Sequence, residues 1–297
     1  METVSMIEMV AQETVSKRIE NKPVVLFTGA HLIKNGLSQL LVDLVNRGLI
    51  TLVAGNGATA IHDFELALIG ETSENVPDAL GTGEFGMAYE FAYINHAVSA
   101  GNEQKLGYGE SLGKMICDAG FRDHVLSSIT KDDSPRNFLH PEISIAAACY
   151  KKNIPFTVHV GIGTDVTDQH PSFDGQAKGG CSGRDFLIYT NEMAKLTSGG
   201  VVLNIGSAVT GPETLLKAVS MAANTGRAPQ NIITADFDLR CHNPDKMSDE
   251  SSDGYYFRDQ KSIVTRIPQA FAGRGFYIQG NQKQTFALLY KKIMEKF

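Results

Sequence analysis

Residues 51–65, TLVAGNGATAIHDFE, join a short apolar run to a helical pattern through a glycine-bearing turn. Thr51 to Ala54 is apolar and partly β-branched, as in a buried strand, and Ala60 to Ile69 carries apolar residues at helical spacing. Between them, Gly55-Asn56-Gly57 tolerates the unusual backbone angles of a tight turn. The segment therefore predicts a strand, a turn and a helix in direct succession.

A ligand is expected at this turn. In an open parallel sheet the carboxyl end of a strand faces the ligand crevice, and the first turn of the next helix offers unpaired N–H groups to phosphates. The motif is shorter than a complete G-x-G-x-x-G, because Ala60 stands where the third glycine would be. A tight turn without a ligand is the alternative interpretation.

The same layout recurs along the chain, where apolar runs of strand length are followed by turns and then by helical patterns. The expected strands are residues 23–27, 49–54, 156–160, 200–203, 231–235 and 262–267, and the expected helices include 32–47, 186–196 and 285–296. Residues 272–281, AGRGFYIQGN, are expected to form a loop. Strands that alternate with helices favour an α/β fold with a parallel sheet and helices on both faces.

One α/β domain is expected over residues 1–297, a length that supports a large core. Residues 1–22 predict an N-terminal helical arm. Residues 71–136 show no convincing strand and are broken by glycines, which predicts a helical insertion. Residues 161–185 have no periodicity, and a loop of this length in a compact domain is usually functional or disordered.

Composition excludes several classes of partner. The net charge of -6 and the absence of long like-charge runs argue against nucleic acid, and no window is apolar enough to span a membrane. The first twenty residues lack the basic and apolar regions of a signal peptide, which favours a cytoplasmic protein. The four cysteines form no C-x-x-C pair, so reduced thiols are expected.

Polar residues near expected strand ends are the candidates for chemistry, because strand ends converge at the crevice. His62 lies one turn into the helix after the glycine turn, where it is placed to reach a ligand or to form a surface pair with Asp63. Asp165, Asp168 and His170 have a spacing that suits a metal, but hydrogen-bonded turns are the commoner role for such residues, and no metal is expected. Asp168 is better interpreted as the partner of a ribose hydroxyl or of a substrate ammonium group.

A second group of candidates follows the strand at 231–235. Asp236, Asp238 and the acidic loop after them suit a small cationic or amine substrate such as a polyamine, with a solvated acidic loop as the alternative. Lys261 follows an apolar-aromatic segment and is a candidate nucleophilic amine for a Schiff base, although most lysines are merely solvated. Ser182 and Ser207 lie in glycine-bearing turns, but no G-x-S-x-G elbow or triad order supports a serine hydrolase.

Five segments in order resemble those with which the deoxyhypusine synthase family lines its NAD pocket. They are PVVLFTGAHLIKNGL, LITLVAGNGATAIHD, IPFTVHVGIGTDVTD, GGVVLNIGS and IITADFD, and the resemblance runs from about Pro23 to the C-terminal helix. It implies a Rossmann-like sheet, NAD as cofactor and a homo-oligomer, either a dimer or a tetramer. Asp168 matches an acidic residue of the family's active-site loop. The cofactor contacts that the resemblance implies are Thr28, Gly29, Ala30, Gly55, Asn56, Gly57, Asn204, Gly206, Ser207, Thr234 and Ala235.

The chain departs from the family at its catalytic positions. Thr210-Gly211-Pro212 stands where the family has a double histidine, and the chain contains no tryptophan for the family's Trp-Gly-Lys segment. An ungapped alignment places Arg266 at the imine-forming lysine, and arginine cannot form that imine. Only a shifted alignment brings in Lys261.

These departures favour a diverged member that does not make deoxyhypusine. The leading hypothesis is an NAD-dependent transferase or oxidoreductase that acts on a polyamine or another small amine. Its candidate catalytic residues are Lys261, His62, Asp168 and Asp238. The alternative is a non-catalytic or regulatory nucleotide-binding oligomer, and hydrolysis in the same crevice ranks last.

Overall fold

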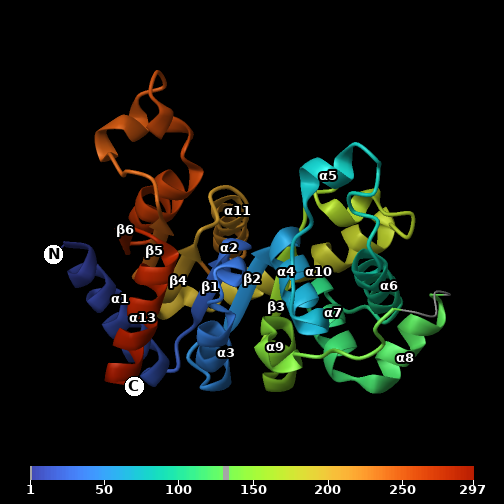
Figure 1. Cartoon of the computed structure of the whole chain (residues 1–297). Helices are drawn as coiled ribbons and strands as arrows, with labels where there is room; N and C mark the ends of the chain where they lie inside the picture. The colour runs from blue at the N-terminus through green and yellow to red at the C-terminus, as the bar shows by residue number, and fades with distance from the viewer. Residues whose placement is uncertain (1, 130–133) are drawn as a thin grey trace.

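The computed structural model describes residues 2–129 and 134–297. Its centre is one parallel sheet of six strands in the order β3-β2-β1-β4-β5-β6 (Figure 1). The strands are β1 (Val24–Thr28), β2 (Leu52–Asn56), β3 (Phe156–His159), β4 (Gly200–Ile205), β5 (Ile232–Asp238) and β6 (Arg274–Gln279). The strand order reverses between β1 and β4, and in open α/β sheets ligands bind in the crevice at such a switch point.

Helices cover both faces of the sheet, as the alternation of side chains along a strand requires. In β1, Val24 and Leu26 belong to one buried cluster, whereas Val25 and Phe27 belong to the other. The first cluster lies under α1 (Glu2–Ile19), α3 (Ser38–Asn46), α4 (Gly57–Ile69), α9 (Ile145–Lys152) and α13 (Gln282–Lys296). The second lies under α10 (Gly175–Met193) and α11 (Thr210–Asn224). The expected α/β, Rossmann-like fold class is confirmed.

The N-terminal helix α1 lies along α13, the first and last helices being side by side (Figure 1). Its buried residues include Ile7, Val10 and Val15. No helix in the described ranges is both long and apolar enough to cross a membrane.

The segment between α4 and β3 is helical where the structure describes it. It contains α5 (Val76–Leu80), α6 (Tyr89–Glu103), α7 (Tyr108–Cys117) and α8 (Ala119–Ser127), and no strand occurs in residues 71–129 or 134–136. Residues 130–133 of the expected insertion lie outside the described residues. Because α6 and α7 also pack against α10, this segment is joined to the sheet domain through a shared core.

Several expectations about local structure were wrong; the expected helix at 32–47, for example, is two helices, His31–Lys34 and Ser38–Asn46, separated around Gly36 with φ +75°. Residues 175–185, expected to be loop, begin α10, where Asp174 caps the helix by accepting from the N–H groups of Gln176 (2.9 Å) and Ala177 (3.0 Å). Their four glycines weaken the helical signal, but buried Ala177 and Cys181 pack in the core.

The C-terminal part was also assigned wrongly. Residues 262–267, expected to be a strand, lie mostly in the π-helix η6 (Gln260–Arg266), which continues into α12 (Ile267–Ala270). The sixth strand is instead β6, within the expected loop at 272–281, and it pairs with β5 from Ile233↔Arg274 to Asp238↔Gln279. Short apolar runs do not distinguish a strand from a buried helix, so this pairing was decided by tertiary contacts.

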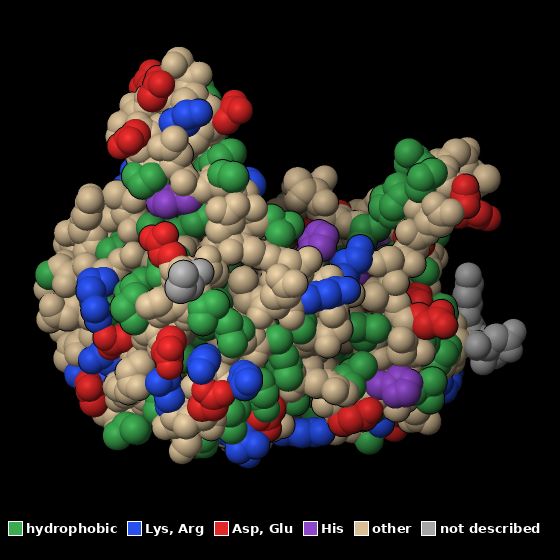
Figure 2. All heavy atoms as spheres, turned by 60° about the vertical axis from the view of Figure 1, so that its left-hand side comes forward, with side chains coloured by type: hydrophobic (Ala, Val, Ile, Leu, Met, Phe, Trp, Pro, Cys, Tyr) green, Lys and Arg blue, Asp and Glu red, His purple; other side chains and the backbone are tan. Residues whose placement is uncertain are grey.

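Two segments rise above the carboxyl edge of the sheet. One, here called the arm, is residues 239–259, which carry the short 3₁₀ helices η4 (Pro244–Ser248) and η5 (Asp253–Tyr256) and are drawn in orange in Figure 1. The other contains α5. Figure 2 shows the surface hollowed between these two projections.

Candidate functional site

One row of side chains crosses the sheet at the switch point. It is apolar on β1 and polar on β4, β5 and β6. Phe27, Asn204, Asp236 and Tyr277 are register partners on the neighbouring strands β1, β4, β5 and β6, so they point to the same face of the sheet. Asn204 Nδ2 donates to Asp236 Oδ1 at 2.7 Å. A fully buried polar row at the carboxyl ends of strands is costly for stability, which favours a functional role.

Two glycines lie just beyond this row at the switch point. The N–H of Gly29 donates to Ile205 O at 3.0 Å, and a Cβ added to Gly29 would collide with the carbonyl oxygen of Gly206. Gly206 has φ +65°, a conformation that favours glycine. The two backbones therefore pack directly against each other at the switch point, and a Cβ on Gly206 would collide with Gln282 Nε2.

Carboxylates gather around a single arginine beside the polar row. Arg240 Nη2 pairs with Asp238 Oδ2 at 2.7 Å and also with Asp259, and its guanidinium lies 4.5 Å from the centre of the Phe257 ring. Asp236 and Asp259 are both 0% exposed. We call Asp236, Asp238, Arg240 and Asp259 the carboxylate cluster; with three acids and one base, it favours a cation.

Unpaired acceptors mark the same region. Among the described residues, Asp236 Oδ2, Asp259 Oδ1 and the amide oxygens of Asn204 and Gln282 are buried without a hydrogen-bond donor. Native proteins rarely leave such atoms unpaired, so they require a donor such as water or a ligand ammonium group.

The carboxyl groups of the cluster differ in proton affinity. Burial and the neighbouring Asp259 raise the pKa of Asp236 well above its ordinary value, and burial raises the pKa of Asp259 to about 6. Burial acts on Asp238 in the same direction, but hydrogen bonds from Arg240 hold the pKa of Asp238 below its ordinary value. The cluster thus combines an ionised carboxylate with carboxyl groups that retain protons more readily.

Lys261 is buried at the base of the arm. It is 6% exposed, and its Nζ donates to Tyr255 O at 3.2 Å and lies 3.3 Å from the centre of the Tyr255 ring. Burial lowers its pKa, and the charges of Arg266 and Arg258 add to this effect. A lysine with a lowered pKa is suited to nucleophilic chemistry, yet here its amine faces Tyr255 of the arm.

The other two candidate catalytic residues contact different partners. His62 Nδ1 lies 2.6 Å from Thr72 Oγ1 and 3.4 Å from Glu65 Oε2, at a cavity of about 310 Å³ between α4 and the α5 segment. Asp168 accepts from Gly163 N at 2.7 Å and pairs with Lys178. No interaction found in the described residues joins His62, Asp168 and Lys261 to one another.

Lys178 is a buried ammonium group that the sequence analysis did not single out. It is 2% exposed and pairs with Asp168 and, at 2.8 Å, with Asp165 Oδ2. It was missed because residues 161–185 were expected to be irregular. Once α10 is seen to begin at Gly175, Lys178 lies in its first turn, opposite both aspartates.

The expected glycine turn at 55–57 is the direct junction of β2 and α4, and side chains of the chain itself fill it. Asn56 Oδ1 accepts from Thr59 N at 2.9 Å, and a Cβ on Gly57 would collide with the Asp165 carboxylate. A Cβ on Gly55 would approach Thr59 Cγ2 to 2.7 Å. A phosphate at this turn would meet the Asp165 carboxylate, which disfavours an anionic group there. Contact of this turn with a nucleotide stays a prediction.

The remaining expected cofactor contacts lie in three settings. Thr28 ends β1 and its hydroxyl donates to Gly29 O at 2.9 Å; Ala30 precedes the short helix α2 (His31–Lys34). Ser207 Oγ accepts from Gly211 N at 2.9 Å at the start of α11. Thr234 and Ala235 lie inside β5, as expected, but the strand continues to Asp238; Thr234 donates to Ile263 O.

No group of three or more His, Cys, Asp or Glu side chains in residues 2–129 and 134–297 is placed to hold a metal ion. In particular, Asp165 and Asp168 share Lys178 instead.

Comparisons with known proteins identify the fold. No protein-family model and no curated protein matches the sequence. A conserved putative LOR/SDH protein from Methanococcus maripaludis S2 has a similar structure, with a TM-score of 0.55 at 18% identity over 99% of this chain and 70% of that chain. ArgZ, an arginine dihydrolase from the ornithine-ammonia cycle in cyanobacteria, matches in its apo form with a TM-score of 0.53 at 18% identity over 100% of this chain and 32% of that chain.

A third similar structure is the ternary complex of AgrE with ornithine and NAD+, with a TM-score of 0.51 at 15% identity over 99% of this chain and 33% of that chain. The chain thus spans about a third of the length of ArgZ and AgrE. A putative deoxyhypusine synthase from Entamoeba histolytica has a lower TM-score of 0.45 at 9% identity over 92% of this chain and 76% of that chain. At these identities the likeness to the LOR/SDH protein, ArgZ and AgrE establishes the fold alone.

Proposed function

We propose that this protein is an NAD-dependent enzyme that acts on the amino group of a small cationic compound, either an amine or a basic amino acid. The observation that carries the proposal is the carboxylate cluster beside the β1/β4 switch point, with its buried, unpaired acceptor oxygens. An ammonium group supplies both the hydrogen-bond donors and the positive charge that these oxygens lack. The similar fold of AgrE, whose complex contains ornithine and NAD+, supports this class of substrate and cofactor.

The chain's residues divide between two tasks in this proposal. The cofactor binds at the β1/β4 switch point, where Gly29 and Gly206 follow the two strands, and Asp238 with Asp259 holds the substrate ammonium beside it. Bound NAD supplies a hydride acceptor for the carbon that carries the amino group. Asp236 holds or releases a proton beside the substrate and the cofactor. Lys261 is the candidate nucleophile if a group is transferred.

The alternative function, a non-catalytic nucleotide-binding protein, has its own support. The amine of Lys261 is covered by Tyr255, and Thr210-Gly211-Pro212 stands where the resembling family has its histidines. Under this alternative, NAD binds but no amine is converted.

The two functions are separated by measuring NAD binding calorimetrically and NADH formation at 340 nm with ornithine, lysine, putrescine and spermidine. The proposal expects binding and turnover with at least one amine. It expects Asp238→Asn to raise KM for the amine about tenfold or more, since the ionised partner of an ammonium is lost. The matched control is Asp245→Asn, an exposed aspartate of the arm, which should leave KM unchanged. Binding without turnover would favour the alternative, and no NAD binding would refute both.

A further inference from the structure

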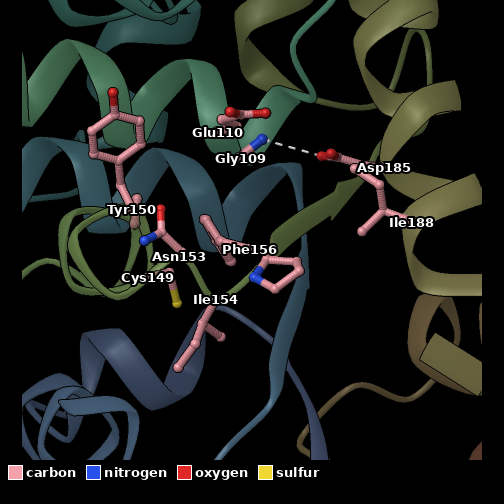
Figure 3. Close-up of a pocket in the computed structure, with 11 residues that line it drawn as sticks. Gly109, Glu110, Cys149, Tyr150, Asn153, Ile154, Phe156, Asp185 and Ile188 are labelled. Carbon is pink, nitrogen blue, oxygen red and sulfur yellow. Dashed lines mark hydrogen bonds between the residues drawn. The ribbon is translucent and has the colours of Figure 1, made fainter. Parts of the chain in front are cut away.

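A second cavity lies at the opposite edge of the sheet from the crevice. Its volume is about 240 Å³, and it is walled by α7, α9, α10 and the amino end of β3 (Figure 3). Most of its lining is apolar, with Ala146, Cys149, Ile154, Pro155, Phe156 and Ile188 among the lining residues. Phe156 is the first residue of β3, so the cavity is separate from the carboxylate cluster at the carboxyl ends of the strands.

The charged groups that line this cavity are all acidic. They are Asp185, which is 1% exposed, and Glu110 at the exposed rim; no lysine, arginine or histidine among the described residues lines the cavity. Asp185 Oδ2 accepts from Gly109 N at 3.1 Å and from Val158 N at 2.8 Å, the first of which is drawn in Figure 3. These N–H groups satisfy its hydrogen bonds but bring no full positive charge, and burial raises the pKa of Asp185 to about 7.

A second buried carboxylate lies behind the α9 wall. Asp63 is 2% exposed and accepts from Ser144 Oγ at 2.7 Å, Ile145 N at 2.7 Å and Ala146 N at 3.0 Å. Ala146 itself lines the cavity. In the part of the chain that the structure describes, neither Asp63 nor Asp185 forms an ion pair. The cavity is thus lined by one buried carboxyl group, Asp185, and a second, Asp63, lies behind its α9 wall; neither has a cationic partner there.

We propose that this cavity binds a small organic cation with an apolar body, such as an alkylammonium ion. The apolar walls favour burial of an alkyl chain, and the ammonium supplies the counter-charge that Asp185, which lines the cavity, lacks among the described residues. Phe156 and Tyr150 also line the cavity, and aromatic rings attract cations.

The site is connected to the crevice by one continuous helix. Asp185 and Ile188 belong to α10, as does Lys178, which pairs with Asp165 and Asp168 at the carboxyl edge. A ligand that contacts Asp185 therefore touches the same helix that positions Lys178. This site is distinct from the substrate site of the proposed function and does not depend on it.

The test is isothermal titration of the full chain with n-butylammonium chloride, with n-butanol as the neutral probe of equal length. Every protein carries Asp238→Asn, which removes the ionised carboxylate of the crevice. The decisive variant is Ile188→Lys, because Ile188 lines the cavity and is 37% exposed. Its matched control is Leu187→Lys, on the same helix, 59% exposed and outside the lining.

The proposal expects butylammonium to bind more tightly than butanol. In Ile188→Lys, the ammonium of the introduced lysine should repel butylammonium and weaken its binding about tenfold or more. Leu187→Lys should change that binding by less than about twofold. Ala146→Leu, which fills the cavity, should weaken both probes, with circular dichroism confirming the fold. Equal affinities in the two lysine variants, equal binding of both probes, or no binding of butylammonium would each overturn the proposal.

Discussion

The side-chain amide of Asn204 on β4 donates to the carboxylate of Asp236 on β5, at 2.7 Å, between register partners that are both buried. The same amide nitrogen donates to Ser207 O at 2.8 Å. Asn204 thus fixes one oxygen of Asp236 and leaves the other, Oδ2, without a donor among the described residues. This pair orients the polar row on which the proposed substrate site depends.

Asn204→Ala should lower the free energy of unfolding by about 1–3 kcal/mol, because it leaves both Asp236 oxygens buried without a donor. Urea unfolding of the wild type and of Asn204→Ala measures this difference in the free energy of unfolding. Asn224→Ala, at an exposed position near the end of α11, is the control and should change it by less than about 0.5 kcal/mol. Equal effects of the two substitutions would contradict the role assigned to Asn204.

Gly29→Ala should abolish NAD binding and destabilise the fold, because its Cβ would collide with Gly206 O where the two backbones meet. Gly183→Ala is the matched control: Gly183 lies within α10, and an added Cβ would meet no described atom within 4 Å. Alanine there should stabilise the protein by about 0.5–1 kcal/mol. Calorimetric titration with NAD and thermal unfolding measure both properties. Normal NAD affinity in a folded Gly29→Ala protein would place the cofactor elsewhere.

Lys178→Met should destabilise the protein by about 3–5 kcal/mol, since two partly buried carboxylates would lose their common counter-ion. Adding Asp165→Asn should recover part of this loss, because one of the stranded charges is then removed. Lys291→Met, which breaks the exposed pair with Glu295, should cost less than about 1 kcal/mol. Urea denaturation of the wild type and these three variants measures the free energies of unfolding. If the double variant is no more stable than Lys178→Met, mutual repulsion of the aspartates is not the cause of the loss.

Stability should depend on pH through Asp63. Burial raises the pKa of Asp63 to about 6, above its unfolded value of about 4. A raised pKa means that the neutral carboxyl favours folding. Its contribution is therefore complete below about pH 4 and is lost as the pH rises through about 6, by on the order of 2 kcal/mol.

The measurement is the free energy of unfolding of the wild type minus that of Asp63→Asn, at several pH values from about 4 to 7. This difference should fall as pH rises. The corresponding difference for the exposed Asp123→Asn should stay flat. A difference that rises with pH would mean that Asp63 is stabilised as the anion.

Lys261→Arg and Lys261→Ala should both remove turnover if Lys261 is the nucleophile, because arginine retains the charge but cannot react as a free amine. NAD affinity should change by less than about twofold, as no contact of Lys261 in the described structure reaches Gly29 or Gly206 at the switch point. Lys246→Ala, at an exposed position of the arm, is the control. Full activity of Lys261→Ala would exclude the lysine from the mechanism.

Local sequence patterns predicted those strands that can be recognised from a few consecutive residues. The apolar runs near 24–28, 52–56 and 200–205 are buried on both faces, so they are recognisable without their neighbours. Asp236 and Asp238 were singled out for the same reason, since they follow such a run directly. Elements that depend on distant partners were misassigned: β6 is an edge strand with half-exposed residues, and its identity depends on pairing with β5.

By itself, then, the sequence determined the α/β class, the parallel strands and the acidic character of the segment after β5, because hydrophobic periodicity and local charge are properties of neighbouring residues. Only the tertiary structure decided which charges meet. Arg240 and Asp259, nineteen positions apart, are joined because the arm folds back, and Lys178 reaches Asp165 only because α10 begins where a loop was expected. Ion pairs and unpaired buried oxygens arise from the packing of distant segments, so no local pattern specifies them.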